Sequence, residues 1–161
     1  MVKERYIWGV LRVFMGWIFL WPFFDKVFGL GLNTAKENAW ITGNSPTTGF
    51  LLNATKGPFV SFFQSLVGNA WVDWLFMIGI LLIGLALLLG IGMRIASASG
   101  ILLMLLFWLA VLPPAHNPFL DEHIIYAIII SGLPIVKAGR VFGFGGWWVE
   151  TSIVRRHHFL E

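Results

Sequence analysis

Several side chains that could carry proton chemistry stand close together in one short stretch of the sequence. His116, Asp121, Glu122, His123 and Tyr126 all lie between residues 116 and 126. Imidazoles next to carboxylates can accept, hold and pass on protons when their surroundings are partly dry. We therefore predict a catalytic site formed by His123, Asp121, Glu122 and Tyr126. His116 and His123 are also candidates for contacting a bound cofactor.

Residues elsewhere in the chain are expected to join this group. Asp25 and Lys26 follow the first apolar stretch, and Asp73 precedes the second. In the helix arrangement described below they reach the same membrane surface as His123, so Asp25 and Lys26 are further catalytic candidates. Trp21 is a candidate for an aromatic wall against the cofactor. The alternative is a hydrated interface in which the acidic residues only cap helices.

The same donors leave a metal site open as an alternative. Two imidazoles and several carboxylates suit zinc, copper or iron, but the Glu-x-x-His pairs of di-iron bundles are missing, and we assign no metal ligands. The chain contains no cysteine, which excludes Fe–S clusters and thiol chemistry. A haem held by histidines is not expected, because neither of the two long uninterrupted apolar stretches contains histidine.

Composition places these residues in a membrane protein. Of the 161 residues, 58% are hydrophobic and 12% are charged, whereas a soluble domain carries roughly 25% charged residues. The net charge of +3 is not arranged as a basic stripe, so binding of nucleic acid is excluded. The expected surroundings are a lipid bilayer.

Four apolar stretches predict an all-α fold, an integral membrane bundle of four transmembrane helices in a single domain over residues 1–161. We expect helices at about 5–24, 73–93, 95–112 and 118–136, because about 20 apolar residues cross a hydrocarbon layer of roughly 30 Å. The fourth helix reaches this length by starting at Pro118, with Asn117 as its N-cap.

Two segments outside the helices complete the predicted fold. The long outer loop 25–72 contains apolar residues at the spacing of one helical face, namely Phe59, Phe62, Phe63, Leu66 and Val67. This spacing predicts a short amphipathic helix. The tail 137–161 contains glycines followed by Trp147 and Trp148, which is typical of an interfacial segment anchored by tryptophan.

The basic residues predict the orientation in the membrane. If both termini are cytoplasmic, three lysines lie outside (Lys26, Lys36, Lys56) and seven basic residues lie inside (Lys3, Arg5, Arg94, Lys137, Arg140, Arg155, Arg156). Basic residues are more frequent on the cytoplasmic side of membrane proteins. We therefore expect a multi-pass protein of the cell (plasma) membrane with both termini in the cytoplasm.

Arg12 is the one charged residue inside the apolar cores of these helices, residues 6–24, 74–93, 95–112 and 124–136. It lies between Gly9 and Gly16 on one helical face. Small residues mark the faces on which helices pack in lipid, so we expect Arg12 to be buried within the bundle. A charge in this position is a candidate for binding a cofactor. The alternative is that Arg12 reaches the cytoplasmic interface or bonds carbonyls at a helix end.

Small residues also predict the packing faces of the other helices. The rows are Gly79, Ala86 and Gly90 in the second, Ala96 and Gly100 in the third, and Ala127 and Ser131 in the fourth. His123 continues the row of the fourth helix, so we expect its side chain to point into the bundle.

The order of several motifs resembles the DoxX/DoxD family. The motifs are Leu11-Arg12 with Gly16, Asp25-Lys26, Gly90-x-x-x-Arg94, the block from Asn117 to Ala127 (NPFLDEHIIYA), and Ala138-Gly139-Arg140. The likeness covers about residues 5–148, and the block at 117–127 is its most specific part. Members of the family are four-helix membrane proteins. The DoxD branch is the membrane subunit of an archaeal thiosulfate:quinone oxidoreductase that works with a partner called DoxA.

This resemblance implies a quinone as substrate and a DoxA-like or other soluble redox subunit as partner. The first hypothesis is thus a quinone-interacting subunit of a thiosulfate:quinone oxidoreductase-like system. A second is a non-catalytic membrane scaffold for a soluble redox partner. A third is a small-solute permease, suggested by Arg12 and Arg94 inside and polar groups outside. A homo-oligomer is compatible with each of them.

Overall fold

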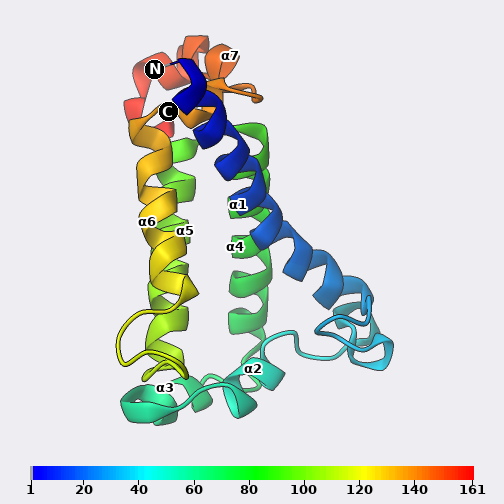
Figure 1. Ribbon diagram of the computed structural model, residues 1–161. Helices are drawn as coiled ribbons and strands as arrows, with labels where there is room; N and C mark the ends of the chain where they lie inside the picture. Colours follow the sequence, from blue (N-terminus) through cyan, green and yellow to red (C-terminus); the bar gives the residue numbers. More distant parts are fainter. Residues whose placement is uncertain (1) are drawn as a thin grey trace.

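A computed structural model describes residues 2–161, and its elements are helices (Figure 1). The four longest are α1 (Val2–Phe28), α4 (Ala70–Leu89), α5 (Met93–Ala110) and α6 (Glu122–Ile135). The short α-helices are α2 (Thr48–Asn53), α3 (Val60–Gln64), α7 (Gly145–Glu150) and α8 (Ser152–Arg156). The 3-10 turns are η1 (Lys36–Asn38), η2 (Trp40–Thr42), η3 (Gly57–Phe59), η4 (Ala138–Arg140) and η5 (His158–Leu160). Both termini lie at one end of the bundle, here called the terminal end, opposite the loop end that carries α2 and α3.

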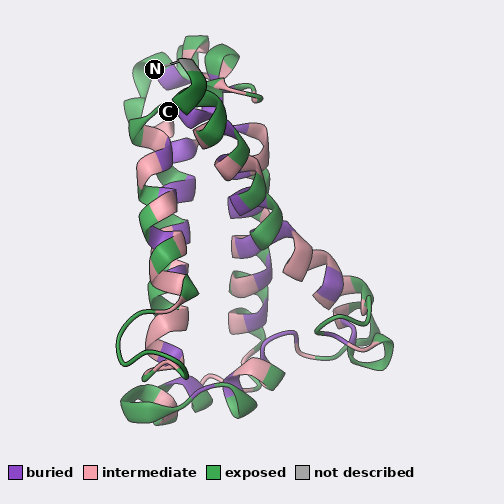
Figure 2. Ribbon diagram, viewed as in Figure 1, coloured by how far each residue is buried: buried purple, intermediate pink, exposed green. Residues whose placement is uncertain are grey.

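Three helices are long and apolar enough to cross a membrane. They are α1, α4 and α5, with candidate spans of 26, 20 and 18 residues. Large apolar side chains are exposed along these helices and α6, among them Phe14, Leu75, Leu82, Leu102 and Ile128, and exposed segments recur along all four in Figure 2. Apolar surface of this extent is unfavourable in water, so it suits a lipid bilayer.

The fourth apolar helix is shorter than predicted, because it starts at Glu122 rather than Pro118. Asp121 is the N-cap, and its carboxylate accepts the backbone N–H groups of His123 and Ile124. Asn117 instead accepts the N–H groups of Phe119 and Leu120, which closes a local turn in the preceding loop. Both side chains can cap a helix, and the asparagine here makes the competing local turn.

The ends of the other long helices also differ from the prediction. α1 extends to Phe28 and includes Asp25 and Lys26. α4 ends at Leu89, four residues early, because Gly90 adopts a left-handed conformation with φ 74°, a common way to end a helix. The turn to α5 is therefore made by residues 90–92.

Two glycines set the crossing of α1 and α4. A Cβ on Gly16 would lie 2.9 Å from the backbone N of Leu88, and a Cβ on Gly84 would lie 2.6 Å from Cγ of Leu20. The backbones therefore approach as small-residue packing in membranes requires. Beyond this crossing the C-terminal part of α1 diverges from α4, as Figure 1 shows at its lower right.

The predicted packing rows are correct for some helices and wrong for others. Ala96 and Gly100 of α5 are buried, and Ser97 beside them donates to the carbonyl of Ile130 at 3.1 Å. A Cβ on Gly79, in contrast, would meet no neighbouring atom within 4 Å. Ser131 is exposed, and its hydroxyl donates to the carbonyl of Ile128 in its own helix. The buried face of α6 is Ala127, Ile130 and Leu133.

The predicted amphipathic helix of the outer loop is present only in part, as α3 after η3. Phe63 is buried with Leu51 and Ala110, and Leu66 and Val67 pack against this small core. Phe59 and Phe62 are exposed at 41% and 59%. The regular helix ends at Gln64, so the five apolar residues do not form one buried face.

Gly84 and Gly79 provide a matched test of the helix crossing, since both lie within α4. Gly84→Ala should lower the free energy of unfolding by about 1–3 kcal/mol, because its methyl group would overlap Leu20 of α1. Gly79→Ala should be neutral or stabilising by roughly 0.5–1 kcal/mol. Reversible unfolding in mixed detergent micelles measures both, and equal effects would rule out this crossing.

Candidate functional site

The strongest candidate site at the loop end is a histidine–carboxylate pair at the start of α6. His123 Nδ1 lies 2.8 Å from Asp121 Oδ2, and the side chains are 20% and 10% exposed. The other oxygen of Asp121 accepts the backbone N–H of His123 at 3.1 Å. Because Asp121 is fixed as the N-cap, it holds the imidazole by Nδ1 and leaves Nε2 for a ligand or for water.

Aromatic rings form one wall beside this pair. The centroid of the His123 ring lies 5.6 Å from that of Phe107 on α5. Phe107 in turn contacts Phe76 of α4 at 6.1 Å and Phe50 of α2 at 5.2 Å. An imidazole with a carboxylate on one side and aromatic rings on the other can bind a polar head group that carries an apolar ring.

Glu122 and Tyr126 lie close to this pair in sequence, but they do not act together in the structure. Glu122 is exposed, whereas Tyr126 is half-buried against the main core. No hydrogen bond joins the two side chains among the described residues. Glu122 therefore faces water or the membrane surface beside His123, and Tyr126 is a packing residue one turn further along α6.

Asp25 is almost fully buried, but it serves its own loop. Its carboxylate accepts the backbone N–H groups of Leu32 at 3.4 Å and of Asn33 at 3.2 Å. Only 1% of the residue is exposed. These bonds close the turn after α1, and half-buried Lys26 lies beside Asp25 in the last turn of that helix.

Asp73 likewise holds the segment that leads into α2. Its Oδ1 accepts the hydroxyl groups of Ser45 at 2.8 Å and of Thr47 at 2.5 Å. Ser45 also accepts the N–H of Thr48. One oxygen of the carboxylate at the start of α4 is thus bound by two local hydroxyl groups.

The predicted convergence of the ionisable groups around His123 is not found. The end of α1 that carries Asp25 and Lys26 lies far from the start of α6 in Figure 1. Asp25 is nine residues beyond Gly16, or roughly 13 Å along the helix, so the inclined crossing at Gly16 carries it away from the other helices. The sequence shows which membrane surface a group reaches, but it does not show the angle between helices.

Two other predicted cofactor contacts are not brought to His123. The described ring partner of Trp21 is Trp17 of the same helix, at 5.8 Å between centroids. His116 is exposed in the loop before α6. The residues that the structure does bring together here are His123, Asp121 and Phe107, and Phe107 was missed because an aromatic residue in an apolar helix carries no distinguishing signal.

A metal could be held only by neighbouring residues at this end. Within residues 2–161, the one group of three or more potential ligands is Asp121, Glu122 and His123, whose ligand atoms lie within 4.8 Å of one another. They are consecutive in sequence, and Asp121 is already committed to capping α6. This arrangement is that of a capped helix start.

Arg12 is buried at the opposite, terminal end, as predicted. None of its side chain is exposed. Nη1 donates to the carbonyls of Leu87 and of Leu88, the latter at 2.8 Å, and Nη2 donates to those of Val141 and Phe142 at 2.9 Å each. The guanidinium therefore links the C-terminal end of α4 to the segment after η4.

This position corrects the assignment of Arg12 as a cofactor contact. Its four hydrogen bonds go to carbonyls, and among the described residues it forms no ion pair with a carboxylate. The partial negative charge of the C-terminal end of α4 stabilises the cation. Phe142 has a φ of 55°, which is unfavourable for a bulky residue, and the bond from Arg12 offsets part of that cost.

No protein-family model matches the chain, and no curated protein or solved structure is significantly similar to it.

Replacement of Arg12 tests its structural role. Arg12→Leu should lower the free energy of unfolding by about 3 kcal/mol or more, because one buried and three part-buried carbonyls lose the charged donor that they share. The free energy of unfolding of Arg12→Lys should lie between those of the wild type and Arg12→Leu, since an ammonium group lacks the planar fork of the guanidinium. Lys3→Leu, at an exposed position of the same helix, is the control. Unfolding in mixed micelles that shows no difference between Arg12→Leu and Lys3→Leu would contradict this role.

Proposed function

We propose that the chain is a DoxX/DoxD-like integral membrane protein that acts as the quinone-interacting subunit of a thiosulfate:quinone oxidoreductase-like system. The observation that carries the proposal is the His123–Asp121 pair, 2.8 Å apart and packed beside Phe107. The resemblance of the motifs, above all the block from Asn117 to Ala127, supplies the class of reaction.

The chemistry required of this subunit is modest. Reduction of a quinone to a quinol consumes two electrons and two protons. Oxidation of a sulfur compound by a DoxA-like or other soluble subunit supplies the two electrons. Nε2 of His123 gives one proton to one ring oxygen and is reprotonated from water, and water supplies the second proton to the other ring oxygen. Asp121 orients the ring through its contact with Nδ1. The aromatic wall offers stacking contacts to the quinone ring.

The geometry favours this function over a permease. The permease hypothesis needs Arg12 or Arg94 to face a solute path. Arg12 is buried and donates to four carbonyls, so this arginine does not face a solute path. A scaffold for a soluble redox partner stays the second candidate, because the exposed α2 and α3 region at the loop end can receive such a partner whether or not quinone binds to this chain.

Quinone binding is tested with the full chain in lipid nanodiscs. A short-chain ubiquinone analogue should bind saturably, and His123→Ala should weaken binding at least tenfold, about 1.4 kcal/mol, by removing the hydrogen bond and ring contact. Asp121→Asn should weaken it less, since the amide still caps α6. The control is His158→Ala, an exposed histidine at the terminal end. Wild-type protein that does not bind, or a His123→Ala variant that binds normally, argues against a quinone site here and leaves the scaffold function.

The proposal includes a topology, in which α1, α4, α5 and α6 all cross the cell membrane and both termini are cytoplasmic. α6 has 14 residues, so it spans together with the loop before it and with local thinning of the bilayer. Ser61 and Ser152 are exposed at the loop end and the terminal end. In intact cells a membrane-impermeant reagent should label Ser61→Cys and not Ser152→Cys, and the reverse pattern or equal labelling contradicts this orientation.

A further inference from the structure

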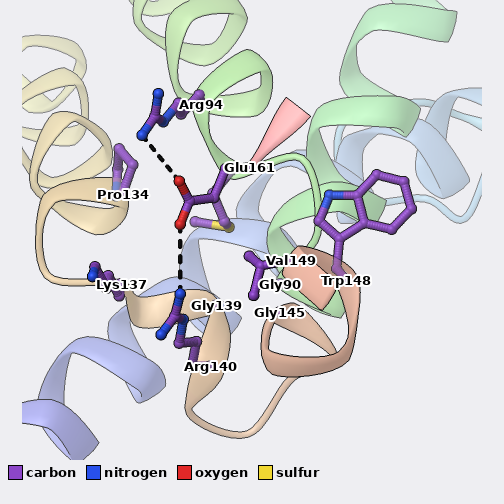
Figure 3. A pocket seen from close by; sticks show the side chains of 11 residues that line it. Gly90, Arg94, Pro134, Lys137, Gly139, Arg140, Gly145, Trp148, Val149 and Glu161 are labelled. Carbon is purple, nitrogen blue, oxygen red and sulfur yellow. Dashed lines mark hydrogen bonds and ion pairs between the residues drawn. The ribbon is translucent and has the colours of Figure 1, made fainter. Parts of the chain in front are cut away.

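A basic pocket at the terminal end is not used by the proposed quinone chemistry. Its volume is about 180 Å³, and it opens between the start of α5, the turn after α6 and α7. The charged residues that line it are Arg94, Lys137, Arg140 and Glu161 (Figure 3). Two sequence motifs without a role in the proposed function meet here, Gly90-x-x-x-Arg94 and Ala138-Gly139-Arg140.

A carboxylate already occupies the centre of this pocket. Glu161 Oε2 lies 3.0 Å from Nη2 of Arg94, and Oε1 lies 3.5 Å from Nη2 of Arg140. Figure 3 shows the carboxylate between the two guanidinium groups. The backbone N–H of Arg94 also donates to the main-chain oxygen of Glu161 at 2.9 Å. Two guanidinium groups that converge on one carboxylate form the arrangement proteins use for oxyanions.

The pocket holds more positive than negative charge. Arg94, Lys137 and Arg140 contribute three positive charges and Glu161 one negative charge, so the lining carries a net charge of +2. Lys137 forms no ion pair within the part of the chain that the structure describes. The carboxylate of Glu161 therefore neutralises only part of the positive charge of the pocket. A group with two negative charges would neutralise more of it.

The ion pairs of Glu161 are weak enough to be exchanged. The side chains of Arg94, Arg140 and Glu161 are 55%, 38% and 30% exposed. Ion pairs with this exposure contribute little to stability. A better anion can thus displace the carboxylate without unfolding the bundle.

The backbone around the pocket adds to its preference for anions. α5 has 18 residues, and its N-cap, Gly92, offers no side-chain acceptor to the first N–H groups. The N–H of Arg94 is bound to the main-chain oxygen of Glu161, and the positive end of the helix dipole favours negative charge at this place. Gly90 and Gly139 shape the wall, since a Cβ on Gly90 would lie 2.5 Å from the carbonyl oxygen of Gly139.

We propose that this pocket binds a phosphate group, and that the Glu161 carboxylate is an internal competitor which occupies the same place when phosphate is absent. The phosphate belongs either to an anionic lipid head group or to a soluble phosphate. The pocket lies at the ends of apolar helices, and Trp148 is part of its lining, which places it at the depth of lipid head groups. The site shares no residue with the His123–Asp121 pair, so either proposal can fail without the other.

The test uses the full chain in nanodiscs and measures the shift of the unfolding temperature that each ligand causes. In one arm, inorganic phosphate is titrated into phosphatidylcholine nanodiscs against chloride at equal ionic strength. In the other, nanodiscs with phosphatidic acid are compared with phosphatidylcholine alone. A saturable shift in the first arm identifies a soluble phosphate as ligand, and a shift in the second arm alone identifies a lipid head group. The absence of a shift in both overturns the proposal.

Variants separate the pocket from general effects of charge. Arg94→Gln with Arg140→Gln should weaken phosphate binding at least tenfold, whereas Arg155→Gln, at an exposed arginine of α8 outside the pocket lining, should bind as the wild type does. A double variant that binds normally, or an Arg155→Gln variant that loses binding equally, overturns the site.

Glu161→Gln tests the internal competition directly and keeps the size of the side chain. Removing the competing charge should tighten phosphate binding by about fivefold. This result does not depend on whether the double variant folds. Binding that is unchanged or weaker in Glu161→Gln overturns the role of Glu161 as competitor.

Discussion

The terminal end of the bundle depends on one buried cation, the guanidinium of Arg12. Its hydrogen bonds join the last carbonyls of α4 to those of Val141 and Phe142, which lie more than fifty residues further along the chain. In a bilayer, unpaired carbonyls at a helix end are costly because no water replaces the missing donor. One side chain of α1 thus donates to the carbonyls of two chain segments. It fixes the place where α1, α4 and the segment after η4 meet.

Close backbone contacts make this arrangement possible. Gly143 lies so near Arg12 that an added Cβ would approach Nη2 to 2.9 Å, and Gly139 and Gly145 pack against Gly90 in the same region. At the crossing itself, Gly16 and Gly84 allow α1 to lie directly on α4. The two sets of glycines hold α1 tightly at the terminal end and let it diverge toward the loop end. The spatial separation of Asp25 from His123 is a consequence of this packing.

The two ends of the molecule offer different chemistry because different groups are left available. At the loop end, Asp25 and Asp73 accept backbone N–H groups and hydroxyl groups, whereas His123 is held to its carboxylate partner through Nδ1 alone in the part of the chain that the structure describes. At the terminal end, Nη1 and Nη2 of Arg12 are bound to carbonyls, while Arg94, Lys137 and Arg140 line a pocket with excess positive charge. The proton-handling role proposed for one end and the anion-binding role proposed for the other rest on this difference.

The sequence by itself determined the helical class, the apolar character of the three long helices and the burial of Arg12, because these depend on local composition and on the spacing of small residues within one helix. It also indicated that Asp121 and His123 belong together, since three consecutive residues at a helix start cannot separate. Only the tertiary structure decided the crossing of α1 over α4, the start of α6 at Glu122 rather than Pro118, and the meeting of Arg94 with Arg140 and Glu161. Crossing angles depend on the fit of side chains between distant segments. The choice between two good caps, Asn117 and Asp121, depends on the local turn that the loop forms around Asn117. Neither is encoded in the periodicity of a single helix.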